Sequence, residues 1–152
     1  MPTYTVSYSS RVNAPAAVAY GIIADYRDGH RHILPPKYFR NLQVQSGGRG
    51  NGTRITFEMG ALGYWRSASA EVREPEPGRL LEETIPAERV LTTFLVEPAG
   101  EDACDVTIST TMPQRAGIAG SIERLTTSAF MRRVYKEELG MLDRVARSRV
   151  AR

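Results

Sequence analysis

The longest regular pattern in the chain is GIAGSIERLTTSAFMRRVYKEELGMLDRVARSR, residues 117–149. It contains no proline, and its apolar residues recur at the three- and four-residue spacing of an α-helix. The stripe consists of Ile118, Ile122, Leu125, Ala129, Tyr135, Leu139, Leu142 and Val145, and Phe130, Val134 and Met141 widen it. Charged residues occupy the opposite side. We therefore predict one long helix whose apolar face, including Leu125 and Leu139, packs against the rest of the chain.

The chain upstream of this helix begins with a strand pattern. Residues 4–12 alternate between two faces, as in a half-buried strand. Asn13 supplies a helix-capping side chain and Pro15 is tolerated in a first turn, so a short helix is expected to about residue 25. Residues 26–36 predict a broken second helix or a loop that ends at two prolines.

Residues 38–112 alternate between strand-like runs and turn residues. The strand candidates are 39–46, 53–60, 63–74, 79–85, 89–97 and 104–112. Short turns between consecutive strands favour an antiparallel meander, and no helix intervenes to allow a parallel crossover. The pattern predicts an α+β fold in which a curved, seven-stranded antiparallel sheet turns its apolar concave face toward the long C-terminal helix.

Composition fits one globular domain over residues 1–152. The chain is 41% hydrophobic and 24% charged, and no apolar run reaches the roughly 20 residues that cross a bilayer. The first residues lack the basic and apolar blocks of a secretory signal, and the single cysteine cannot form an internal disulfide. We therefore expect a cytoplasmic protein, and the sequence leaves the oligomeric state open.

Several short segments have a recognisable order and spacing. They are Ala14-Pro15 after the first strand, GNGTRI at residues 50–55, EPGRLL at residues 76–81 and VEP at residues 96–98. In this order they resemble the polyketide cyclase/dehydrase and lipid-transport family, which belongs to the START-related, helix-grip superfamily. The resemblance covers nearly the whole chain. It implies a helix-grip fold with a ligand cavity, but no particular reaction, because members include cyclases, lipid carriers and hormone receptors.

Two charged residues are predicted to point into that cavity. Arg66 shares a strand face with Ala68, and Glu83 lies between Leu81 and Ile85. Burying an unpaired charge costs free energy, so the two side chains could pair with each other or bind a polar ligand group. A one-residue register error or a bulge would instead turn either side chain to solvent.

The remaining ligand-binding candidates are mostly aromatic. They are Phe57, Met59, Tyr64, Phe94 and Tyr135, together with His32. His30 is the alternative to His32 at the cavity mouth, where an imidazole could act as an acid or base. No further histidine or second cysteine completes a tetrahedral metal site, so we expect no metal and no cofactor. No catalytic residue is assigned.

These features leave three hypotheses for function. The first is binding of a hydrophobic or amphipathic small molecule, and the second is a cyclase or dehydratase acting on a polyketide-like substrate. The third is a protein or RNA-particle interaction module that uses the basic C-terminal helix. Residues 132–152 carry seven basic and three acidic residues, but the last seventeen contain no aromatic residue to stack on bases, which argues against nucleic-acid binding.

Overall fold

The elements follow one another in the predicted order in the computed structural model, which describes residues 2–151. They are β1 (Thr3–Val12), α1 (Ala16–Ala24), the 3-10 helix η1 (Gly29–His32), β2 (Phe39–Ser46), β3 (Arg54–Ala61), β4 (Tyr64–Glu76), β5 (Leu80–Ile85), the 3-10 helix η2 (Pro86–Glu88), β6 (Val90–Pro98), β7 (Cys104–Pro113) and α2 (Gly117–Val150). The segment predicted as a broken helix or loop contains η1.

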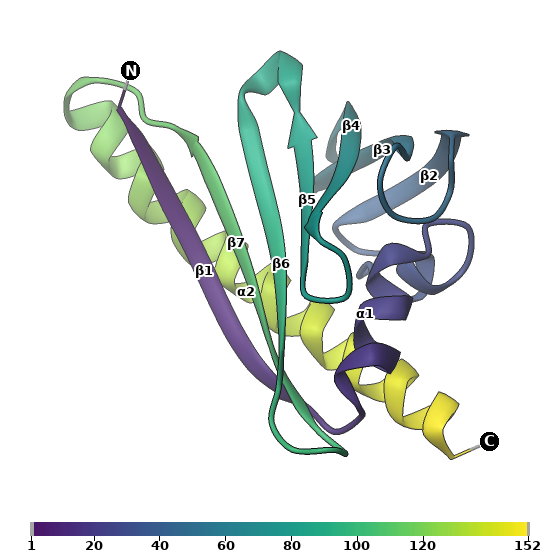
Figure 1. Ribbon diagram of the computed structural model, residues 1–152. Helices are drawn as coiled ribbons and strands as arrows, with labels where there is room; N and C mark the ends of the chain where they lie inside the picture. Colours follow the sequence, from purple (N-terminus) through teal and green to yellow (C-terminus); the bar gives the residue numbers. More distant parts are fainter. Residues whose placement is uncertain (1, 152) are drawn as a thin grey trace.

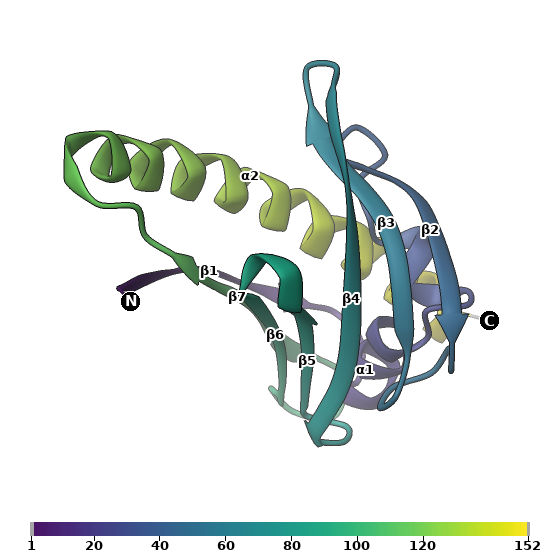
Figure 2. The same ribbon diagram turned by 90° about the horizontal axis from the view of Figure 1, so that it is seen from above.

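All seven strands form one antiparallel sheet in the order β1-β7-β6-β5-β4-β3-β2. Strands β2 to β7 make the predicted meander, and β1 completes the sheet by pairing with β7. The first and last strands of the chain therefore lie side by side (Figure 1). The sheet bends strongly, and α2 runs across its concave side (Figure 2). This arrangement confirms the predicted α+β helix-grip fold.

The core lies between the concave face and the helices. Alternate residues of each strand are buried there, for example Ala68, Ala70 and Val72 of β4. The second half of α2 contributes Leu139 and Leu142, which are 1% and 0% exposed. Helix α1 packs against α2 and β6 and buries Ala19, Tyr20, Ile22, Ile23 and Ala24. Burial on alternate strand residues therefore confirms the assignment of the concave face as apolar.

The first half of α2 differs from the sequence prediction. Ile118 is 81% exposed and Leu125 is 71% exposed, so the expectation that Leu125 packs against the sheet is wrong. Apart from Gly120, the buried residues of α2 begin at Val134. The physical reason is spacing: the first turns of α2 stand off from the start of β1 and the end of β7, so their side chains do not reach the core (Figure 2).

No helix within residues 2–151 is long and apolar enough to cross a membrane.

Candidate functional site

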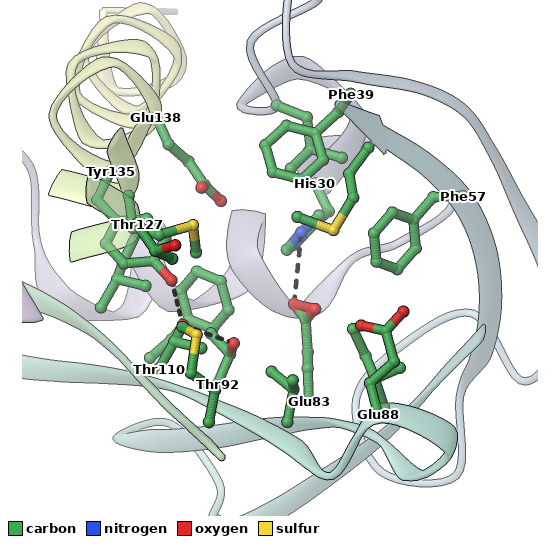
Figure 3. Close-up of a pocket in the computed structure, with 18 of the residues that line it drawn as sticks. His30, Phe39, Phe57, Glu83, Glu88, Thr92, Thr110, Thr127, Tyr135 and Glu138 are labelled. Carbon is green, nitrogen blue, oxygen red and sulfur yellow. Dashed lines mark hydrogen bonds and ion pairs between the residues drawn. The ribbon is translucent and has the colours of Figure 1, made fainter. Parts of the chain in front are cut away.

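A cavity of about 140 Å³ lies between the concave face of the sheet and α2 (Figure 3). Its apolar lining consists of Leu34, Phe39, Phe57, Met59, Ile85, Val90, Phe94, Ile108, Met112 and Met131. Its polar lining consists of His30, Arg66, Glu83, Glu88, Thr92, Thr110, Thr127, Tyr135 and Glu138. Engineered cavities of about 150 Å³ accept a benzene molecule, so this space suits one ring or a group of similar size.

His30 reaches the cavity because η1 sits tightly on α1. A Cβ on Gly29 would lie 2.8 Å from the carbonyl oxygen of Ile22, so only glycine permits this approach. The His30 ring is 2% exposed, and its Nδ1–H donates to the Ile23 carbonyl oxygen at 2.7 Å. A carbonyl can only accept, so the proton is on Nδ1 and the second ring nitrogen, Nε2, faces the cavity.

Glu83 of β5 lies opposite that nitrogen. Its Oε1 is 3.6 Å from His30 Nε2 and accepts a 2.8 Å hydrogen bond from the Tyr26 hydroxyl. The Tyr26 ring stacks on the His30 ring with centroids 4.2 Å apart. Burial and the negative charge of Glu83 raise the pKa of Tyr26 well above its ordinary value, so this phenol remains a donor. The three side chains form one connected polar cluster, of which His30 and Glu83 line the cavity.

Glu138 of α2 stands apart from this cluster. Its side chain points into the cavity and the residue is 3% exposed (Figure 3). No residue among 2–151 forms a hydrogen bond with its carboxyl group. Burial and the charge of Glu83 raise the pKa of Glu138 well above its ordinary value. The fold thus favours the protonated form of Glu138, and its carboxyl group is available for a hydrogen bond to a ligand.

Three hydroxyl groups connect the sheet to α2 beside Glu138. The Thr92 and Thr110 hydroxyl oxygens are 2.8 Å apart, and Thr110 forms a second hydrogen bond with the Tyr135 hydroxyl. Burial is the main reason that the pKa of Tyr135 lies above its ordinary value. The chain of hydroxyls therefore offers neutral groups that can both donate and accept.

Arg66 occupies the rim of the cavity. Strands β3 and β4 pair regularly there, with Met59 opposite Arg66, so the predicted strand face is correct. The side chain, however, is 64% exposed, and its Nη2 lies 3.1 Å from Glu88 Oε2. The suggested pairing of Arg66 with Glu83 is wrong, because η2 places the Glu88 carboxylate closer to the guanidinium.

The other sequence candidates fall inside and outside the cavity. Phe57, Met59, Phe94 and Tyr135 line it together with Arg66 and Glu83. Tyr64 does not: it is 84% exposed beside the β3–β4 turn, over a shallow neighbouring groove. His32 is also outside, with Nε2 2.9 Å from Asp28 Oδ1. Two steps along a 3-10 helix rotate a side chain by about 240°, so only one of the two histidines can face inward.

Several lining residues were not predicted from the sequence, among them Glu138, Thr92 and Thr110. Glu138 had a detectable signal, because it follows Tyr135 by three residues and precedes Leu142 by four, which places it on the apolar helix face. A lone acid on such a face is unusual and marks a candidate site. The partner of Glu83, Tyr26, had no such signal, because it lies in an irregular segment.

Comparisons with known proteins agree with this architecture. A family model described as polyketide cyclase / dehydrase and lipid transport matches residues 3–147. The solution structure of the KanY protein (ms6282) is similar with a TM-score of 0.84 at 24% identity, covering 97% of this chain and 99% of that one. The structure of the Zhui aromatase/cyclase from Streptomyces sp. R1128 is similar with a TM-score of 0.79 at 16% identity, covering 98% of this chain and 96% of that one.

A START superfamily protein from Mycobacterium smegmatis gives a TM-score of 0.67 at 15% identity, covering 97% of each chain. A search of curated proteins finds no match. At these identities the solved structures establish a shared fold.

Proposed function

Since the chain belongs to the polyketide cyclase/dehydrase and lipid-transport family, we propose that it binds a small, largely apolar molecule in the cavity between the sheet and α2. The observation that carries this proposal is the buried, unpartnered carboxyl of Glu138 at the end of an apolar space. Ligand sites combine apolar walls with a few polar groups that fix orientation, and this cavity has both.

The size of the space limits what it holds. About 140 Å³ accommodates one ring and a short substituent, and a longer molecule would extend into the groove lined by Tyr38, Phe130 and Val134. The apolar walls contribute through area removed from water, at about 25 cal/mol per Å². The polar end fixes the orientation of the ligand, because the Glu138 carboxyl has no hydrogen-bond partner among the described residues and can bond to a polar group of the ligand.

Filling the cavity should abolish binding. Met131 of α2 lines the cavity, whereas Met141 of the same helix does not and is comparably part-buried. We expect Met131→Trp to weaken binding of 2-phenylethanol at least about tenfold, which corresponds to about 1.4 kcal/mol. Met141→Trp should bind normally. NMR titration of labelled protein measures both affinities and reports whether His30 and Tyr135 shift.

Mass spectrometry of denatured wild-type protein identifies any molecule that co-purifies. Equal affinities of the two tryptophan variants, or no binding of 2-phenylethanol by the wild type, would contradict the proposal.

A second candidate function is acid–base catalysis, and one observation favours it. Glu138 is a neutral acid, while His30 Nε2 lies beside Glu83 and faces the same space. A carboxylic acid and an imidazole nitrogen that face one space can act as acid and base. In the dehydration of a β-hydroxy ketone, His30 would take the proton next to the carbonyl and Glu138 would protonate the leaving hydroxyl, which yields an enone and water.

This activity is testable with 4-hydroxy-4-phenylbutan-2-one, whose dehydration product absorbs in the near ultraviolet. His30→Gln and Glu138→Gln should each lower the rate about 100-fold or more, the usual size of general acid–base contributions. Glu137→Gln, next to Glu138 but paired with Lys37 outside the cavity, should have no effect. A rate that survives both cavity substitutions would exclude these roles.

A further inference from the structure

The charged groups inside the cavity are predominantly acidic. Glu83 and Glu138 both lie in it, the first with 13% of its side chain exposed and the second almost completely buried. Among the lining residues that the structure describes, Arg66 is the only permanent cation, and Glu88 already neutralises it at the rim. The interior therefore has two carboxyl groups and no arginine or lysine to balance them.

From this arrangement we propose that the cavity selects a ligand with a basic amine on a small apolar body, and that Glu138 binds the ammonium group. The inference rests on the proposed function and names its ligand class. It depends on the unpartnered side chain of Glu138, which points into an existing cavity, and not on acidic residues alone.

An ammonium group supplies what the buried site lacks. It brings a positive charge and three N–H donors, and carboxylates are the strongest acceptors for such donors. Glu138 and Glu83 approach the space from α2 and β5, and the Tyr135 hydroxyl lies beside Glu138 on the same helix (Figure 3). An ammonium group paired with Glu138 would therefore share the space with a second carboxylate and a hydroxyl group, while the apolar body contacts the aromatic walls.

The proton balance of this step is defined. Without ligand Glu138 holds a proton, because burial and the charge of Glu83 raise its pKa. A primary amine in neutral water is already an ammonium ion. Binding therefore converts the acid to a carboxylate, and its proton leaves to solvent. The other titratable groups that line this space are His30 and Tyr135, with Arg66 and Glu88 at the rim. Tyr26 does not line it but contacts His30 and Glu83, and burial keeps both tyrosines neutral.

Ligands of other charge fit less well. A carboxylate of the same size would add a third acidic group to a space without a free cation, at the cost of desolvation and repulsion. A neutral alcohol could accept the hydrogen bond that Glu138 offers, but it gains no charge pair. Arg66, which the sequence suggested as a partner for a polar ligand group, is paired with Glu88 at the rim and does not offset this cost.

Three matched probes test the proposal by isothermal titration calorimetry: phenethylamine, 2-phenylethanol and phenylacetate. We expect phenethylamine to bind at least about tenfold more tightly than 2-phenylethanol, since hydrogen bonds between charged groups are roughly twice as strong as neutral ones. Phenylacetate should bind most weakly. Titrations in two buffers with different ionisation heats should show proton release on binding of the amine and none on binding of the alcohol.

Glu138→Gln provides the decisive variant, because glutamine has the shape of the protonated acid and cannot ionise. We expect it to lower phenethylamine affinity about tenfold, to abolish the proton release and to lower 2-phenylethanol affinity less than phenethylamine affinity, so that the amine preference is lost. Glu137→Gln is the matched control on the same helix and should behave as wild type.

Two results would overturn the proposal while leaving small-molecule binding intact. One is phenylacetate binding as tightly as phenethylamine, and the other is an unchanged amine preference in Glu138→Gln. If none of the three probes binds, the proposed function fails and the amine preference fails with it.

Discussion

At the level of single residues, Glu138 makes the stability of the protein depend on pH. Its pKa is raised in the folded state, so folding favours the protonated carboxyl. The stabilisation from that proton is fully present below the ordinary carboxyl pKa and is lost as pH rises through the folded-state pKa. The wild type therefore has its largest penalty for burying Glu138 at high pH.

Glu138→Gln should remove this pH dependence. We expect the free energy of unfolding of the variant to exceed that of the wild type increasingly as pH rises above about 4.5, by at most about 1.4 kcal/mol per pH unit. Above the folded-state pKa the difference should level off. Urea unfolding between pH 5 and pH 8 measures the two curves.

The control is Glu101→Gln, an exposed turn residue for which a constant difference is expected. If the free energies of unfolding of Glu138→Gln and the wild type ran parallel over this pH range, folding would not raise the pKa of Glu138, which would contradict the prediction.

At the level of elements, α2 has two halves with different roles. The half from Val134 onward holds the sheet through buried side chains, and the first half carries exposed apolar residues beyond it. Leu139→Ala should therefore lower the free energy of unfolding by about 2–5 kcal/mol, the usual cost of removing a fully buried leucine.

Leu125→Ala is the matched control on the same helix. With 71% of the residue exposed, the change should alter stability by less than about 0.5 kcal/mol in the same urea experiment. A large loss in Leu125→Ala would show that the first turns of α2 pack against something in solution.

At the level of the whole molecule, the cavity exists only when both layers are assembled. Its walls come from η1, the six strands β2 to β7, η2 and α2, and the pairing of β1 with β7 joins residues about a hundred positions apart. A ligand held there should therefore stabilise the whole fold against unfolding. At a hundred times its dissociation constant, 2-phenylethanol should add about 2.7 kcal/mol to the free energy of unfolding.

The same urea experiment on Met131→Trp provides the control, because a filled cavity leaves no site for the ligand. Equal stabilisation of both proteins would place the binding elsewhere on the surface.

Much of the fold was predictable from the sequence. Alternation over residues 4–12 and the breaks at Gly47–Gly52 and Pro75–Gly78 located the strands, and helical spacing located α2, because these patterns depend on local geometry. The strand faces of Arg66 and Glu83 followed from the same alternation, and both residues line the cavity.

The tertiary structure decided what lies opposite each side chain. Periodicity put Leu125 and Leu139 on one helix face, but only the way α2 lies on the sheet determines that the first is exposed and the second buried. Likewise, Arg66 meets Glu88, while Glu83 meets Tyr26 and His30. The physical reason is that a periodic pattern fixes the direction of a side chain relative to its own backbone, whereas its partner comes from a distant segment brought near by folding.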